Sequence, residues 1–172
     1  MQRQLFLLRH ANAHSSAPGG DDHERRLDAA GIDAARRAGR YLARNELHPG
    51  LAICSSARRA VETFDYLGAE LAPTPRVQIE KSLYLASREE LLARLTQVED
   101  TLSSLLVVAH SPGLGALAHQ LAGAGDAYAL RRLGSEFPTC TLVGLRFEQP
   151  SWRNLAPGIA TLIEFTTPRD LL

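Results

Sequence analysis

The sequence has few cysteines and no excess of charge of either sign. Its two cysteines in 172 residues cannot form a disulfide framework. Both Cys54 and Cys140 stand in apolar runs typical of strands, which favours buried, reduced thiols over a disulfide or a catalytic cysteine. The 19 basic and 19 acidic side chains cancel to a formal net charge of +0. This balance argues against nucleic-acid binding through the overall field of the protein.

Long hydrophobic runs are also lacking. The apolar run that follows Met1 is interrupted by Arg9, so it is too short for a membrane helix or for the core of a signal peptide. We therefore expect a cytoplasmic protein that is not membrane-bound. A chain of 172 residues with 45% hydrophobic content predicts one domain over residues 1–172 with its own core, and a monomer is the default expectation.

Strand-like runs alternate with helical ones along the chain, which predicts a layered α/β domain with a mainly parallel sheet. Hydrophobic spacing predicts helices over 28–45 and 57–71. A capping box of Ser87 and Glu90 opens a third helix, and a fourth is expected after Pro112. The polar, glycine-rich segment 15–22 is expected to be a loop that can lie over a site as a flap. The expected strands are 4–9, 51–55, 76–80, 104–109, 140–147 and 160–166.

Three of these strands end on side chains suited to anion chemistry. Arg9 and His10 follow the first strand, Arg59 opens the helix after the second, and His110 follows the fourth. Ligands of parallel sheets bind at the carboxyl ends of the strands, so we expect these side chains to converge. A desolvated arginine beside a histidine is costly unless an anion joins them. The sequence therefore predicts an anion site.

Phosphoryl transfer is the chemistry that uses such a set. Planar guanidinium groups bind phosphoryl oxygens, a neutral imidazole is a nucleophile toward phosphorus, and a second, protonated histidine adds charge in the transition state. Helices expected after Ser56 and Pro112 would point their N-termini at the same place. None of these roles needs a metal or a cofactor.

Several segments resemble the histidine phosphatase superfamily, the phosphoglycerate mutase-like proteins. LLRHANA resembles its RHG motif, CSSARRAVET its second motif and VVAHSP its third. DHERRLDAAG at 22–31, SLYLASREELL at 82–92 and the terminal Pro168 and Arg169 are similar to the SixA-type phosphohistidine phosphatases. The resemblance implies a three-layer α/β/α fold with a mainly parallel sheet and an antiparallel edge. It also implies a metal-independent phosphatase without cofactor.

The resemblance implies roles for individual residues. His10 corresponds to the phosphorylated nucleophile, and Arg9, Arg59 and His110 to the phosphate pocket. Arg59 is preferred to Arg58 because the alanine, glutamate and threonine that follow then match the family's second motif. Asn12 either donates to the phosphate or stabilises its own turn.

The implied substrate is phosphohistidine on a signalling protein. The alternatives are a small phosphorylated metabolite and a non-catalytic phosphate-binding module, which would be indifferent to His10. The sequence departs from the family at Ala11, where glycine is usual, and in lacking a clear carboxylic acid for the leaving group. Glu80, Glu89 and Glu90 are the candidates nearby, although capping and a helix N-terminus already explain the last two.

Two other enzyme classes fit single motifs. AHSPG resembles a serine hydrolase elbow around Ser111, but the only later histidine, His119, precedes every acid that follows Ser111, which is the wrong triad order. His10 and His14 have the spacing of a zinc motif. That motif needs a glutamate and a helix, and this segment has neither.

Overall fold

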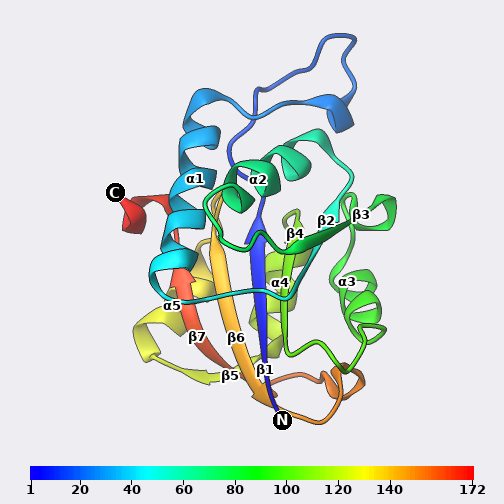
Figure 1. Cartoon of the computed structure of the whole chain (residues 1–172), viewed down its shortest axis with the longest axis vertical. Coiled ribbons are helices and arrows are strands. Elements are labelled where there is room, and N and C mark those ends of the chain that lie inside the picture. The colour runs from blue at the N-terminus through cyan, green and yellow to red at the C-terminus, as the bar shows by residue number, and fades with distance from the viewer.

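A computed structural model describes all residues, 1–172, as a seven-stranded sheet with helices on both faces (Figure 1). The strand order is β3-β2-β4-β1-β6-β7-β5, and β6 alone runs antiparallel to its neighbours. The strands are β1 (Gln2–Arg9), β2 (Leu51–Ser55), β3 (Arg76–Glu80), β4 (Ser104–Ala109), β5 (Ala122–Gly125), β6 (Leu142–Glu148) and β7 (Ala160–Thr166).

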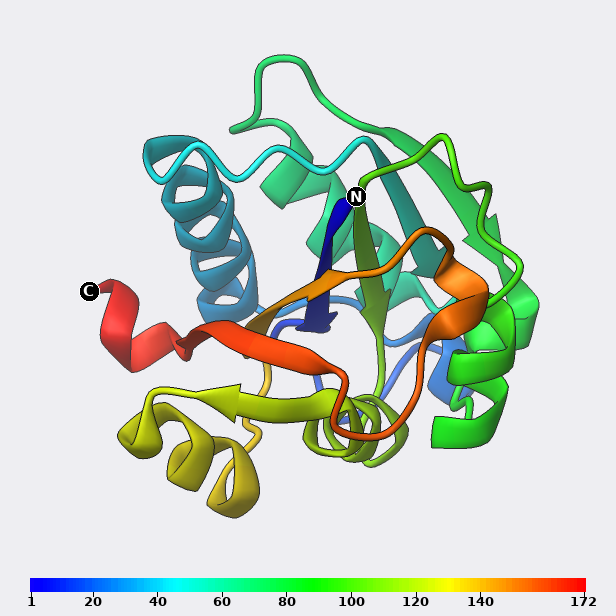
Figure 2. The same ribbon diagram turned by 90° about the horizontal axis from the view of Figure 1, so that it is seen from below.

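Five α-helices form the outer two layers, seen on either side of the sheet in Figure 2. One hydrophobic core lies between the sheet and α1 and α2, and a second lies between the sheet and α3, α4 and α5. None of these helices has the length and apolar composition needed to cross a membrane. The helices are α1 (Ala29–Arg44), α2 (Arg58–Gly68), α3 (Arg88–Leu95), α4 (Gly113–Leu121) and α5 (Ala127–Ser135).

The central strand β1 shows why helices cover both faces of the sheet. Leu5 and Leu7 pack into one core, while Phe6 and Leu8 pack into the other, and all four are fully buried. Successive side chains of a strand point to opposite faces, so a continuous apolar run requires a cover on each side. The hydrophobic run at the start of the sequence therefore accounts for the three layers.

The expected fold class and the expected strands and helices are confirmed, with ends that differ by a few residues. The antiparallel strand, which was expected at an edge, is β6 and lies between β1 and β7. Its residues Leu142 to Leu145 are buried, as an interior position requires. Both β5 and α5 were missed. The β5 segment is AGAG, which has no hydrophobic alternation to mark a strand.

The capping box that opens α3 and the reduced state of the cysteines are confirmed. Ser87 Oγ accepts from the Glu90 backbone N–H, and the Glu90 carboxylate accepts from the Ser87 N–H. Cys54 and Cys140 are free and buried, and burial raises the pKa of each thiol to about 12. Such thiols are unreactive near neutral pH.

The register of the central strands brings the expected functional side chains to one edge. Arg9 pairs with Ala109, and the backbone N–H of His10 donates to the Ala109 carbonyl at 3.1 Å. His10 and His110 therefore leave two neighbouring strands at the same level. On the other side of β4, β2 ends at Ser55 and α2 starts three residues later.

Candidate active site

A pocket of about 410 Å³ lies at this edge and gathers the expected side chains. Arg9, His10, Arg59 and His110 all line it. They come from the end of β1, the first turn of α2 and the end of β4. The convergence inferred from three strand ends is therefore present in the structure.

His10 has a defined tautomer in this pocket. Its Nδ1 lies 2.8 Å from the Ala11 carbonyl oxygen, which can only accept, so Nδ1 carries a proton. In the neutral ring Nε2 then holds a lone pair, and Arg59 Nε donates to it at 3.3 Å. Burial lowers the pKa of His10 to about 4, with Arg59 and Arg9 acting in the same direction and the Ala11 hydrogen bond against it. The ring is thus a neutral base whose lone pair faces a cation.

Arg59 and the His10 loop are held together by Thr63. The Thr63 hydroxyl donates to the Arg59 carbonyl at 2.6 Å and accepts from the Ala11 backbone N–H at 2.9 Å. Ala11 is fully buried in the core, so the methyl group that replaces the family's glycine packs there. This link fixes the loop that carries His10 against the helix that carries Arg59.

His110 is also buried and neutral. Its Nε2 shares a 2.6 Å hydrogen bond with Ser55 Oγ, and its ring centroid lies 5.2 Å from that of His10. Burial, with the nearby His10 and Arg59 acting in the same direction, lowers the pKa of His110 to about 3. Its Nδ1 is buried and has no hydrogen-bond partner. An anion in the pocket would reverse these effects by favouring the protonated ring.

Arg9 completes the group from the β1 side. One terminal nitrogen donates to the Phe137 carbonyl at 2.7 Å, which aims the guanidinium along the pocket, while Nε is buried without a partner. Burial and the charge of Arg59 lower the pKa of Arg9. Unpaired buried donors are rare and costly. Arg9 Nε and His110 Nδ1 are therefore two sites where a bound anion would lower the free energy.

Three residues missed in the sequence complete the site. Asp22, at the end of the expected flap 15–22, and Arg25, three residues beyond it, line the pocket, and Tyr84 reaches Asp22 from the segment after β3. The Tyr84 hydroxyl donates to Asp22 Oδ2, and Arg25 Nε donates to Oδ1 at 2.9 Å. The Tyr84 hydrogen bond, with Arg25 and Arg59, lowers the pKa of Asp22 to about 2. Two sequence signals pointed to this segment: the expected flap at 15–22, which ends at Asp22, and the resemblance of 22–31.

The segment 15–22 is a loop beside the site, and only its last residue, Asp22, lines the pocket. The His14 N–H donates to the Arg26 carbonyl at 2.9 Å, so the loop closes on itself and returns its far end to the pocket. A 3₁₀ turn at Asp22–Glu24 is anchored by His23, whose Nε2 lies 2.9 Å from Ser56 Oγ. In Figure 1 the loop projects beyond the end of the sheet above α2.

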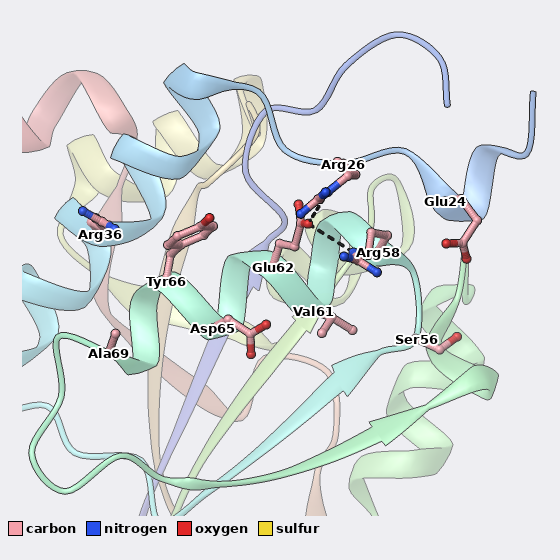
Figure 3. A pocket seen from close by; sticks show the side chains of 10 residues that line it. All are labelled: Glu24, Arg26, Arg36, Ser56, Arg58, Val61, Glu62, Asp65, Tyr66 and Ala69. Atoms are coloured by element: carbon pink, nitrogen blue, oxygen red, sulfur yellow. Dashed lines mark hydrogen bonds and ion pairs between the residues drawn. The ribbon is translucent and has the colours of Figure 1, made fainter. Parts of the chain in front are cut away.

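Arg58, the arginine not chosen for the site, does not line this pocket. It lines a separate cavity of about 730 Å³ on the outer side of α2, where Arg58 Nε donates to Glu62 at 3.1 Å and Arg26 donates to the same carboxylate at 2.7 Å (Figure 3). The Arg58 side chain is 46% exposed, whereas the Arg59 side chain is 3% exposed. The two adjacent arginines therefore serve different surfaces.

Asn12 lines the pocket, and one of the two N–H groups of its side-chain amide donates to Asp28. The candidate acids stand outside the pocket. Glu80 forms a forked ion pair with Arg94, whose shortest N···O distance is 2.7 Å. Glu89 pairs with Arg88, and Glu90 is used in the capping box.

The structure does not assemble a serine triad or the zinc site. Ser111 Oγ is buried with no hydrogen-bond partner, so no base activates it. His14 is exposed, and no group of three or more histidine, cysteine or acidic side chains is placed to hold a metal ion.

The two buried histidines give a first prediction. In NMR titrations of the anion-free protein, His10 and His110 should titrate near pH 4 and pH 3, well below the ordinary value of about 6.5. The unfolded chain then binds more protons than the folded one, so these groups lower the free energy of unfolding as pH falls from about 6.5 to 4. Adding tungstate should raise both midpoints. Midpoints near 6.5 without anion would contradict the described burial and charge.

Comparison with known proteins agrees with this geometry. Residues 5–84 match the model of the histidine phosphatase superfamily (branch 1). The uncharacterized protein Rv1276c of Mycobacterium tuberculosis is 35% identical over 165 residues, covering 94% of this chain and all of the relative.

Solved structures show the same architecture. A protein from Nakamurella multipartitia assigned as the phosphohistidine phosphatase SixA superposes with a TM-score of 0.84, at 29% identity over 98% of this chain and 97% of that chain. One with the same assignment from Agrobacterium tumefaciens gives 0.80 at 27% identity, over 96% and 98% of the two chains. The motifs, the pocket they form and these relatives together show that the chain belongs to the histidine phosphatase superfamily.

Proposed function

We propose that this protein hydrolyses phosphohistidine carried by another protein, through a covalent phosphohistidine formed at His10. The observation that carries the proposal is the neutral His10 ring, whose Nε2 lone pair faces the Arg59 guanidinium in a pocket that also contains Arg9 and His110. The family and its phosphatase relatives support a phosphatase of this kind.

The charges of the pocket suit a phosphoryl dianion. Arg9, Arg25 and Arg59 bring three positive charges to its lining and Asp22 one negative charge, which leaves two in excess. Arg59 and Arg9 would bind the phosphoryl oxygens, and the unpaired Nδ1 of His110 would donate a third hydrogen bond. Binding the dianion raises the pKa of His110, so the ring gains its proton when the charge arrives.

The reaction then takes two displacements. His10 Nε2 attacks phosphorus with its lone pair, and the bond to the leaving atom breaks with its electron pair going to that atom. The Ala11 carbonyl, which holds the Nδ1 proton, stabilises the charge that His10 gains. Water then attacks phosphorus, the bond to Nε2 breaks and returns the lone pair to His10, and inorganic phosphate leaves. No metal takes part in either step.

The absence of a carboxylic acid favours a nitrogen leaving group. The only carboxylate that lines the pocket is Asp22, whose pKa of about 2 keeps it ionised. An alkoxide needs a proton in the transition state, while a histidine side chain leaves as an imidazole whose conjugate acid has a pKa of about 6.5. This pocket therefore suits phosphohistidine better than a small alkyl phosphate.

The proposal predicts a steep dependence on the leaving group. We expect a high kcat/KM for phosphoramidates and aryl phosphates and a low kcat/KM for alkyl phosphates, measured with a chelator present. The substrate series consists of a phosphohistidine peptide, aryl phosphates whose leaving groups have graded pKa values, and a sugar phosphate. A kcat/KM that does not depend on the pKa of the leaving group would indicate a general acid and a small phosphomonoester substrate.

Three variants serve as internal controls for that series. Glu80→Gln, Glu89→Gln and Glu90→Gln should leave the slope unchanged, since none of these carboxylates lines the pocket. A variant that steepened the slope would identify its glutamate as the proton donor, and loss of all activity on addition of chelator would contradict the metal-free mechanism.

A further inference from the structure

We infer that Asp22 and Leu85 form a subsite for the leaving imidazole ring: the Asp22 carboxylate accepts a hydrogen bond from the ring nitrogen that does not carry phosphorus, and Leu85 packs against the ring. This inference rests on the proposed function and extends it to the recognition of the substrate's nitrogen base.

Asp22 stands beside the nucleophile. Arg59 contacts His10 through Nε and contacts Asp22 through both terminal nitrogens, one to the backbone carbonyl at 2.8 Å and the other to Oδ2 at 3.2 Å. A single guanidinium therefore separates the carboxylate from His10 Nε2. A phosphoryl group held by Arg59 has its leaving group within reach of Asp22.

The carboxylate has an acceptor position left for a ligand. Oδ2 accepts from Arg59 and Tyr84, whereas Oδ1 accepts only from Arg25. A carboxylate offers about four lone-pair positions, so Oδ1 can take another donor. The Asp22 side chain is 50% exposed, which makes that position accessible. Tyr84, Arg25 and Arg59 hold the group in place from three separate segments.

A carboxylate at this position changes the leaving group. When the second ring nitrogen carries a proton, the phosphorylated ring is an imidazolium. Attack by His10 on phosphorus then sends the P–N electron pair to the departing nitrogen, and a neutral imidazole leaves with its N–H intact. Without that proton the ring would leave as an anion. Asp22 favours the protonated ring by hydrogen bonding to it and by its charge.

Leu85 supplies the apolar part of the subsite. It lines the pocket, and its side chain remains exposed, with 57% of its surface open to solvent. Its backbone has a positive φ of 53°, a conformation that leucine rarely adopts. Strained backbone of this kind concentrates at ligand sites. The position directly follows Tyr84, so the same short segment presents the leucine and orients Asp22.

Asp22 also works against other substrates. A phosphomonoester has no N–H or positive charge to offer, so its phosphoryl group meets the carboxylate as a like charge and competes with it for Arg59. One residue thereby raises activity on phosphohistidine and lowers affinity for phosphate esters.

The test compares two substrates in one variant. Asp22→Asn should lower the ratio of kcat/KM for a phosphohistidine peptide to kcat/KM for p-nitrophenyl phosphate by about tenfold or more. The alkaline limb of the pH profile on the peptide should move to lower pH, because the bound ring loses its proton more readily. Leu85→Ala should raise KM for the peptide by a larger factor than it raises KM for the aryl phosphate.

Asp33→Asn is the matched control, since Asp33 is an exposed carboxylate of α1 that pairs with Arg37 at 2.8 Å. It should leave both substrates unaffected. If Asp22→Asn lowered kcat/KM equally for both substrates, or did not lower it for the peptide, the subsite would be contradicted. The proposed phosphatase activity would not be affected by that result. A wild-type protein that hydrolyses the aryl ester but never the peptide would overturn the proposed function as well.

Discussion

His10→Ala protein is expected to lose turnover by a factor on the order of 10⁴ or more, while still binding tungstate. The variant removes the only lone pair that Arg59 Nε faces in the pocket, but it leaves Arg9, Arg59 and His110 to hold the anion. Turnover is measured with p-nitrophenyl phosphate, and anion binding by calorimetry on the same preparation. Retained binding separates loss of the nucleophile from loss of the fold.

His14→Ala provides the control for this experiment. His14 is exposed and four residues further along the chain, so its loss should change neither turnover nor binding. Undiminished turnover in His10→Ala would contradict covalent catalysis at this residue and would favour a phosphate-binding module or another nucleophile.

Arg59→Ala is expected to lower kcat/KM by at least about a hundredfold, because it removes a donor that follows the phosphoryl group into the transition state. The buried guanidinium contacts both His10 and Asp22, so no neighbouring side chain replaces it. Arg58→Ala should change kcat/KM little, since its side chain pairs with Glu62 on the outer side of α2.

The pair of variants also tests the alignment of the second motif. Both remove one positive charge from adjacent positions of one helix turn, so their overall electrostatic effect is similar. A large loss in Arg58→Ala with a small one in Arg59→Ala would show that the motif had been read one residue out of place.

The sequence predicted those site residues that directly follow a strand. Arg9, His10 and His110 could be predicted because a parallel sheet brings the ends of neighbouring strands to one edge, and the register of Arg9 with Ala109 does so here. Arg59 could be chosen over Arg58 because the residues after it match a motif. The layered α/β architecture followed from the alternation of strand-like and helical runs, and the resemblance to the family implied its three layers.

The other features of the site and the fold depend on contacts that the spacing of residues in the sequence does not reveal. Asp22 reaches the site only because a long loop closes between His14 and Arg26 and returns to the pocket. Leu85 faces the pocket in a left-handed conformation that leucine gives no reason to expect. Arg3 is fully buried within β1, where four backbone carbonyls from distant segments accept its hydrogen bonds. Each arrangement joins residues far apart in the chain.

The most direct test of the account is to find the phosphoryl group on the enzyme. Wild-type protein is mixed with a phosphohistidine peptide, quenched within its first turnovers under alkaline conditions that preserve phosphohistidine, and mapped by mass spectrometry. We predict a single added phosphoryl group on the peptide that contains His10, absent from His10→Ala and increased in amount when the second displacement is slowed at low temperature. A phosphoryl group on Ser111, or turnover with no phosphorylated enzyme at any quench time, would contradict the mechanism.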